Sequence, residues 1–213
     1  QSHVDRLSQV AEVNASTSRR GKGAAIMSGF DALDTDILAF ADADGSVPAA
    51  SLDSIIQQIA EGTADVSIAS RRHPASHIVA HQTIVRRLLG DVFAVAARTM
   101  LPTQCRDYQC GAKAVRTEAW QAIGHHCYEP GFAWDLEFVS IAGSLGYGIA
   151  EVPVDWEDHP DSTVNPVSTT IELATALIDV KRRTDAIAMS PRHRGVTKTD
   201  QSKLMKLGGD DGD

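Results

Sequence analysis

A short apolar run at residues 36–41 ends abruptly in the acidic turn Asp42-Ala43-Asp44-Gly45. An apolar segment of this length, bounded by turn residues, predicts a strand that is buried on both faces of a sheet. Ligands of open α/β sheets collect at the carboxyl ends of the strands, which is where Asp42 and Asp44 stand. Hard cations such as Mg²⁺ or Mn²⁺ favour carboxylate oxygens combined with waters and phosphates. The segment therefore predicts a metal site, and a solvated acidic turn is the alternative interpretation.

Apolar runs and helical patterns alternate along the chain. Strands are expected at residues 13–15, 36–41, 65–70, 109–115 and 149–156, and helices at 4–12, 24–33, 49–61, 81–100, 118–123, 133–145 and 169–187. This alternation predicts an α/β fold with a mostly parallel sheet flanked by helices. Thr117 is expected to cap the helix that follows it. Residues 189–213 are polar and rich in glycine and charge, so we expect one domain over 1–188 and a disordered tail.

Charge and cysteine content narrow the functional classes. The formal net charge of −8 argues against a nucleic-acid-binding protein, which would carry a basic face. No window approaches the roughly 18 apolar residues that a membrane span needs. The cysteines Cys105, Cys110 and Cys127 have no zinc-site spacing and predict small, partly buried, reduced thiols in the cytoplasm, with a metal-holding role of Cys105 and Cys110 as the alternative. The chain opens with Gln1 and shows no signal peptide, so we expect a fragment of a longer protein.

A basic, glycine-containing turn precedes the helix at 24–33, with the sequence Arg19-Arg20-Gly21-Lys22-Gly23. Glycines let a backbone approach a phosphate closely, and the amino end of the following helix favours an anion. Lys22 and Gly23 are therefore candidates for binding a substrate phosphate. The spacing differs from that of a Walker A loop. A glycine turn with surface charges explains this segment equally well.

Three further groups of polar residues are candidates for the site. Asp107, Gln109 and Lys113 surround Gly111 at the start of a predicted strand, and an ordinary turn is the alternative. Asp135 and Glu137 open a predicted helix, where they either serve an acceptor or simply complement the helix dipole. Arginine suits phosphate recognition, and the chain has the pairs Arg71-Arg72 and Arg86-Arg87. Arg71 and Arg86 are the candidates, although a solvent-facing charge explains at least one member of each pair.

Taken in order, these segments resemble family 2 glycosyltransferases, in the dolichyl-phosphate sugar synthase branch. The resemblance covers residues 16–164 and rests on Gly21-Lys22-Gly23, Asp42-Ala43-Asp44-Gly45, Ser70-Arg71, the segments 107–113 and 132–137, and Glu151-Val152-Pro153-Val154. It implies a GT-A-type, Rossmann-like fold. The Gln109-Cys110-Gly111-Ala112-Lys113 form is nearer to the glucosyltransferases of this branch. The family opens with two strands that this chain does not show, so we expect a sheet that lacks its first strands.

The resemblance also implies an activity, which is inverting transfer of a sugar from a nucleotide-sugar of the UDP-glucose or GDP-mannose type to a polyisoprenyl (dolichyl) phosphate. Asp42 and Asp44 would hold the Mg²⁺ or Mn²⁺ ion, and Lys22 would serve the donor. Arg71 and Arg86 would hold the acceptor phosphate, which Asp135, or else Asp107, would orient. A lipid-borne acceptor implies peripheral contact with the cytoplasmic face of a membrane.

Two other functions remain open at this stage. A nucleotidyltransferase that makes nucleotide-sugars also combines a basic glycine loop with aspartates on an α/β sheet, but its loop is longer and follows the first strand. A binding module that retains the fold without catalysis is the second alternative, because the segment that opens the family is not seen in this chain.

Overall fold

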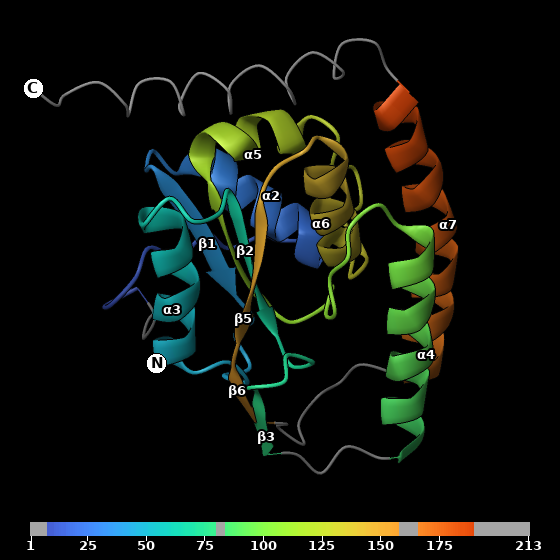
Figure 1. Ribbon diagram of the computed structural model, residues 1–213. Coiled ribbons are helices and arrows are strands. Elements are labelled where there is room, and N and C mark those ends of the chain that lie inside the picture. The colour runs from blue at the N-terminus through green and yellow to red at the C-terminus, as the bar shows by residue number, and fades with distance from the viewer. Residues whose placement is uncertain (1–7, 80–83, 158–165, 190–213) are drawn as a thin grey trace, which may run out of the picture.

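The computed structural model describes residues 8–79, 84–157 and 166–189 of the chain. Its centre is a four-stranded sheet in the order β1-β4-β2-β5, made of β1 (Ile37–Ala41), β4 (Ala112–Arg116), β2 (Val66–Ser70) and β5 (Ile149–Pro153) (Figure 1). Strand β2 pairs in parallel with β5, whereas β4 runs antiparallel to both β1 and β2. The mixed α/β architecture with a central sheet confirms the predicted fold class.

The direction of β4 is the one departure from the mostly parallel sheet that the sequence predicts. The last residue of β1, Ala41, lies opposite the first residue of β4, Ala112. The loop before β4 therefore brings the chain to the end of the sheet where β1 finishes. A strand that enters from that end has to run against its neighbours, so β4 is antiparallel.

Helices cover both faces of the sheet. Helix α3 (Ala49–Ala60) packs on one face and contacts all four strands. The other face carries α2 (Lys22–Ala32), α5 (Thr117–Gly124) and α6 (Trp134–Ser144), with α4 (Ile84–Met100) and α7 (Pro166–Met189) packed side by side beyond α6 (Figure 1). Two apolar cores result, because successive strand residues point to opposite faces. In β1, for example, Leu38 faces the α6 core and Ala39 the α3 core.

Several element boundaries differ from those predicted. The expected strand over 149–156 breaks at Val154 into β5 and the short β6 (Asp155–Glu157), which pairs with β3 (His77–Val79) in a separate two-stranded sheet. Residues 8–12 form a turn and irregular chain instead of a helix, and 13–15 form no strand. The remaining part of that expected helix, residues 4–7, and the expected tail from 190 onward lie outside the described residues.

The predicted cap of α5 is wrong. Helix α5 begins at Thr117 itself, and no side chain caps it. The hydroxyl of Thr117 donates instead to the backbone oxygen of Thr35, and the N–H of Thr117 donates to the oxygen of Asp36. Thr117 therefore ties the start of α5 to the chain just before β1.

Candidate active site at the carboxyl edge of the sheet

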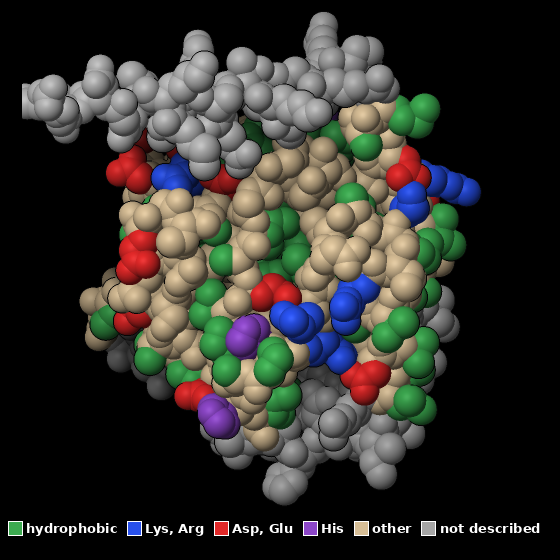
Figure 2. Space-filling view, in the orientation of Figure 1, with side chains coloured by type: hydrophobic (Ala, Val, Ile, Leu, Met, Phe, Trp, Pro, Cys, Tyr) green, Lys and Arg blue, Asp and Glu red, His purple; other side chains and the backbone are tan. Residues whose placement is uncertain are grey.

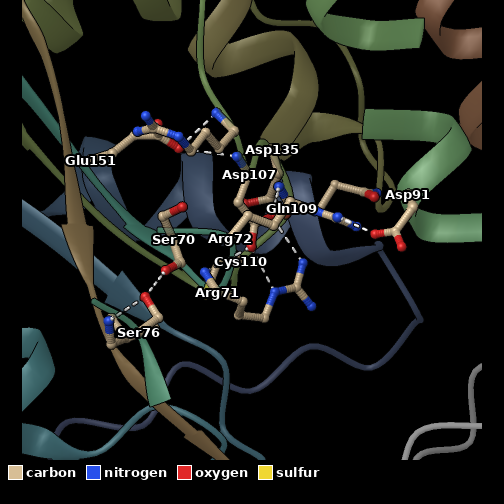
Figure 3. A network of polar contacts seen from close by, with 12 residues as sticks. Ser70, Arg71, Arg72, Ser76, Asp91, Asp107, Gln109, Cys110, Asp135 and Glu151 are labelled. Carbon is tan, nitrogen blue, oxygen red and sulfur yellow. Dashed lines mark hydrogen bonds and ion pairs between the residues drawn. The ribbon is translucent and has the colours of Figure 1, made fainter. Parts of the chain in front are cut away.

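Three segments that carry predicted site residues meet at one edge of the sheet. Asp42 follows β1, Arg71 follows β2, and the segment 107–111 leads into β4. Figure 3 shows Arg71 close to Asp107. Because β4 is antiparallel, its amino end lies beside the carboxyl ends of β1 and β2. The reversed strand thus brings Asp107, Gln109 and Lys113 to the edge at which ligands of such sheets bind.

Asp42 lies directly against the backbone of Gly111. The N–H of Asp42 donates to the carbonyl of Gly111 at 2.7 Å. A Cβ atom at position 111 would stand 2.1 Å from Oδ2 of Asp42, so only glycine leaves room for this carboxylate. The Asp42 side chain is 38% exposed and therefore remains accessible from outside.

The ammonium of Lys22 bridges two aspartates. Its Nζ atom lies 2.9 Å from Oδ1 and 3.1 Å from Oδ2 of Asp42, and 2.8 Å from Oδ2 of Asp135. Burial alone would lower the pKa of Lys22, but the charges of Asp135 and Asp42 raise it above the usual value. Lys22 is therefore a fixed positive charge at the start of α2.

Lys113 completes a chain of alternating charges. Its Nζ atom lies 2.6 Å from Oδ1 of Asp135 and donates to the carbonyl of Cys110 at 2.7 Å. The side chains of Lys113 and Asp135 are 1% and 3% exposed. The ring of Phe40 lies 5.4 Å from the Lys22 ammonium and 5.7 Å from that of Lys113, a cation–π arrangement with both. The resulting charge cluster, namely Lys113, Asp135, Lys22 and Asp42, runs from the core to the surface.

Asp44 stands outside the charge cluster. It is exposed, and its Oδ1 atom accepts a hydrogen bond from the N–H of Ser46 at 3.0 Å. Gly45 between them has a φ of 76°, the left-handed conformation that glycine adopts without strain. Asp44 therefore shapes the turn that follows β1 and keeps its carboxylate toward the outside.

The two aspartates fit a cation that arrives with a phosphate ligand. Within the described part of the chain, no three His, Cys, Asp or Glu side chains gather into a metal cage. Mg²⁺ is commonly held by one or two carboxylates, its remaining ligands being waters and substrate phosphates. An accessible Asp42 with Asp44 two residues further on matches that donor set, whereas it does not match a structural metal site.

Arg71 is held in place by Asp107. Its Nε and Nη2 atoms donate to the two carboxylate oxygens of Asp107 at 2.7 and 2.9 Å, and its guanidinium lies 5.5 Å from the ring of Trp156. Asp107 also accepts from the backbone N–H groups of Arg71 and Gln109, each at 3.1 Å. Burial alone would raise the pKa of Asp107, but the Arg71 charge holds it well below its usual range. Asp107 is thus a permanently ionised anchor for Arg71.

Arg72 and Arg106 do not share the position of Arg71 beside Asp107. Arg72 forms an ion pair with Asp91 of α4 and so turns away from the cluster. The N–H groups of Arg106 and Asp107 donate to Oε1 of Glu151 at 2.8 and 3.0 Å, which fixes the loop that carries Asp107. The side chain of Arg86 lies outside what the structure describes. In the orientation of Figure 1, basic side chains gather on the surface between the sheet and α4 (Figure 2).

The structure places Glu137 away from the charge cluster. Its fully buried carboxylate accepts from the N–H groups of Tyr128 and Glu129 at 2.9 and 2.8 Å and pairs with Arg183 of α7. Burial raises the pKa of Glu137. The contacts that the structure shows for Glu137 therefore belong to the loop at 128–131 and to α7.

That loop fills the amino end of α2, where an anion was expected. The N–H of Gly23 donates to the oxygen of Gly131 at 3.3 Å, and the N–H of Ala24 donates to that of Pro130 at 3.1 Å. Gly21 turns the chain into the helix with a φ of 93°. These amides bind the loop at 128–131 and do not face an open site. Gly23 therefore packs against that loop, and in this segment the ammonium of Lys22 is the group that faces Asp42.

The cysteines are more deeply buried than the sequence predicts. All three are free and buried. Burial raises the pKa of Cys105 and of Cys110 to about 12. They are therefore protonated at neutral pH and are poor nucleophiles and poor metal ligands.

Glu151 also lines a separate pocket of about 390 Å³. His73, Arg106 and Tyr147 contribute to its lining. It is wide open to solvent and contains none of the predicted site residues. We therefore place the candidate site at Asp42 and Arg71, where charge and burial are concentrated.

Some contributors to the site were not singled out from the sequence. Phe40, Trp156, Glu151 and Arg183 all contact candidate site residues. Glu151 stands within a segment that carries the family resemblance, which is the signal that could have found it, and Phe40 lies in the apolar run directly before the acidic turn. Trp156 and Arg183 have no local signal, because their partners lie far away in the sequence.

Comparison with known proteins decides the family. The model of glycosyl transferase family 2 matches residues 2–123, more than half of the chain. The chain belongs to this family. The family match agrees with the arrangement described above, in which an acidic turn follows strand β1 at the ligand-binding end of the sheet. The prediction that this strand is buried on both faces is wrong, because β1 lies at the edge of the sheet and only Leu38 in it is fully buried.

Named relatives of the chain refine the comparison. Glycosyltransferase AglD of Haloferax volcanii is 29% identical over 163 residues, which are 76% of this chain and 26% of that protein. The dolichyl-phosphate beta-glucosyltransferase of Dictyostelium discoideum is 27% identical over 168 residues, 77% of this chain and 51% of the relative. The chain thus spans about half the length of the Dictyostelium enzyme and about a quarter of AglD. The predicted branch of the family is confirmed as the group that the chain resembles.

Solved structures confirm the fold. Glucosyl-3-phosphoglycerate synthase of Mycobacterium tuberculosis in complex with UDP superposes with a TM-score of 0.55 at 16% identity, over 77% of this chain and 56% of the other. The same enzyme with Mn²⁺, UDP-glucose and phosphoglyceric acid gives a TM-score of 0.55 at 15% identity, with the same coverage. The likeness establishes a GT-A-type fold for this chain.

Proposed function

We propose that the protein is an inverting, metal-dependent glycosyltransferase that moves a sugar from a nucleotide-sugar to a polyisoprenyl phosphate. The observation that carries the proposal is the accessible carboxylate of Asp42, held against Gly111 at the carboxyl edge of the sheet with Lys22 across its oxygens. The names of the relatives favour glucose as the sugar and dolichyl phosphate as the acceptor. GDP-mannose is the second donor to test.

Asp42 and Asp44 are the residues that would hold Mg²⁺ or Mn²⁺. When bound there, the ion supplies Lewis-acid neutralisation of the charge on the departing nucleoside diphosphate. Lys22 adds a second positive charge at the same place. Because Lys22 is largely buried and paired on two sides, it is already oriented before a donor arrives, which is the condition for electrostatic stabilisation of a leaving group.

Arg71 is the candidate for binding the acceptor phosphate. Asp107 accepts from Nε and Nη2 of Arg71, so the remaining guanidinium N–H groups are the ones that can donate to a phosphate. Trp156 supports the guanidinium plane. Arginine fixed on two sides loses little side-chain entropy on binding, which favours a defined position of the attacking oxygen.

An acceptor phosphate has little need of a general base, because it is anionic near neutral pH. Both oxygens of Asp135 contact a lysine ammonium, which suits an orienting role better than proton transfer. We therefore propose that Asp135 positions Lys22 and that Asp107 positions Arg71. Gln109 lies in the same loop, with its N–H bound to Asp107, and Lys113 fixes Asp135 from inside.

A lipid-borne acceptor implies contact with a membrane. No helix that the structure describes is long and apolar enough to cross one. We propose peripheral contact at the cytoplasmic face through α4, where Leu88, Val92 and Val95 are 62%, 61% and 60% exposed. The spacing of these residues places them on one side of the helix, as in helices that lie in a bilayer surface.

A donor screen tests the proposed function. The full-length protein is mixed with vesicles that contain polyprenyl phosphate, with Mn²⁺ and with radiolabelled UDP-glucose or GDP-mannose. We expect sugar to enter the lipid fraction with one donor only, to require the metal, and to be accompanied by free nucleoside diphosphate. Release of pyrophosphate would indicate a nucleotidyltransferase. Cosedimentation without any turnover would indicate a binding module.

A further inference from the structure

The side chain of Lys22 occupies the position that a metal ion bound to Asp42 would need. Its ammonium lies within 3.1 Å of both carboxylate oxygens of Asp42. The backbone of Gly111 lies against the same carboxylate, because a Cβ atom at position 111 would stand 2.1 Å from its Oδ2 atom. A cation that binds Asp42 must therefore share its oxygens with Lys22 or displace the ammonium from them.

The charge cluster is electrically balanced as it stands. The positive charges of Lys22 and Lys113 offset the negative charges of Asp42 and Asp135, and the side chains of Lys22 and Asp135 are only 13% and 3% exposed. A divalent cation alone would add uncompensated positive charge beside Lys22, where partial burial weakens solvent screening. The diphosphate of a nucleotide-sugar brings negative charge that balances the ion.

Lys22 has a second partner that it can keep when it leaves Asp42. Its ammonium lies 2.8 Å from Asp135, which Lys113 holds from inside at 2.6 Å. The start of α2 is itself fixed, because Gly23 and Ala24 donate to the loop that Glu137 holds. The backbone at Lys22 thus stays in place, and only the end of the side chain has to move.

We propose that Lys22 is an internal counter-ion that blocks Asp42 in the free protein and makes binding of the divalent metal conditional on the donor diphosphate. This inference rests on the proposed function, since it takes Asp42 as a metal ligand. It adds an order to that function: the ion and the diphosphate enter together, and the ammonium passes from Asp42 to the phosphate oxygens. By linkage, the metal and the nucleotide then strengthen each other's binding by the same factor.

Titration calorimetry of the full-length protein tests the proposal, with Mn²⁺ added in the absence and in the presence of uridine diphosphate or guanosine diphosphate. The main variant is Lys22→Gln, which removes the charge while its amide can still hydrogen-bond to both aspartates. We expect Lys22→Gln to bind Mn²⁺ alone about tenfold more tightly than the unaltered protein. We also expect the nucleotide to improve Mn²⁺ binding by a smaller factor in this variant.

Two further variants serve as controls. Lys22→Arg keeps the charge, so its affinity for Mn²⁺ alone should stay as low as that of the unaltered protein. Lys181→Gln removes a lysine of α7 that pairs with Asp185 on the same helix, and it should change neither affinity. Circular dichroism and a thermal melt verify that each variant is folded before it is titrated.

The outcomes separate this inference from the proposed function. Equal or weaker binding of Mn²⁺ alone by folded Lys22→Gln would overturn the blocking role and show that Lys22 merely supports the site. If no variant binds Mn²⁺ with either nucleotide present, the metal site itself is wrong, and this inference is overturned together with that part of the proposed function.

Discussion

Replacing Asp42 with alanine is expected to lower the rate of sugar transfer by roughly a thousandfold, which corresponds to about 4 kcal/mol of lost transition-state stabilisation. The Asp42 carboxylate is accessible from outside and also contacts the ammonium of Lys22. Without its carboxylate, the ion loses its main protein ligand and the leaving diphosphate loses its neutralising charge. Initial rates with the donor found in the screen, measured at saturating acceptor, give the effect directly.

The fold should survive this substitution. The Asp42 side chain is 38% exposed, and Lys22 retains Asp135 as a partner. The melting temperature should therefore change by only a few degrees. Asp53→Ala, at an exposed aspartate of α3, is the matched control and should keep full activity. Turnover near the normal rate in the double variant Asp42→Ala/Asp44→Ala would rule out the metal role of both residues.

Replacing Asp135 with alanine should cause the largest loss of stability of any single change in the site. Lys113 is 1% exposed, and its ammonium has Asp135 as its charged partner at 2.6 Å. Removing one member of a buried ion pair leaves the other charge without compensation, which typically costs about 3–5 kcal/mol. Urea unfolding followed by circular dichroism measures the change in the free energy of unfolding.

Two comparisons make this prediction specific. Asp179→Ala removes an exposed aspartate of α7 and should alter the free energy of unfolding by about 0.5 kcal/mol or less. Asp135→Asn keeps the shape of the side chain but removes its charge, so we expect a folded protein in which transfer is slow because Lys22 loses its charged anchor. A stable Asp135→Ala protein would show that Lys113 finds another partner, and normal transfer by Asp135→Asn would show that the charge of Asp135 does not position Lys22.

The local parts of the site could be predicted from the sequence because their signals are local. The apolar run of β1 and the acidic turn after it are adjacent in the chain, so strand and candidate metal ligands were recognised together. The same holds for α3 after Pro48 and for the fully buried strand β2. Each of these elements follows from the spacing of apolar residues and from turn residues at its ends.

The pairing of charges could not be predicted, because it depends on how distant segments meet. Lys22, Asp135 and Lys113 are each predicted as site residues, but nothing in the sequence indicates that one aspartate binds both lysines. Glu137 is predicted as an alternative to Asp135 at the acceptor site because both acids open the same helix. On a helix, residues two apart point in different directions, and Glu137 meets Arg183 of α7 instead.

The antiparallel direction of β4 could not be predicted for the same reason, because it depends on contacts between segments that are distant in the sequence. The pattern of residues 109–115 indicates a buried strand, but it contains no information about direction. Direction is set by where the preceding loop delivers the chain, and that loop is held by contacts of Asp107 with Arg71 and of its N–H with Glu151. Arg71 directly follows β2, and Glu151 lies in β5. Both are far from β4 in the sequence, so the direction of β4 is determined only when these segments meet in the folded protein.

The central claim is that Asp42 and Asp44 bind a divalent cation that carries the diphosphate of the donor. Anomalous diffraction from crystals of the full-length protein soaked with Mn²⁺ and uridine diphosphate tests it most directly. We predict a manganese peak within coordination distance of the Asp42 carboxylate and of the diphosphate, with the Lys22 ammonium moved off Asp42. A manganese peak elsewhere, with Asp42 still bound to Lys22 while the nucleotide is in place, would contradict the account.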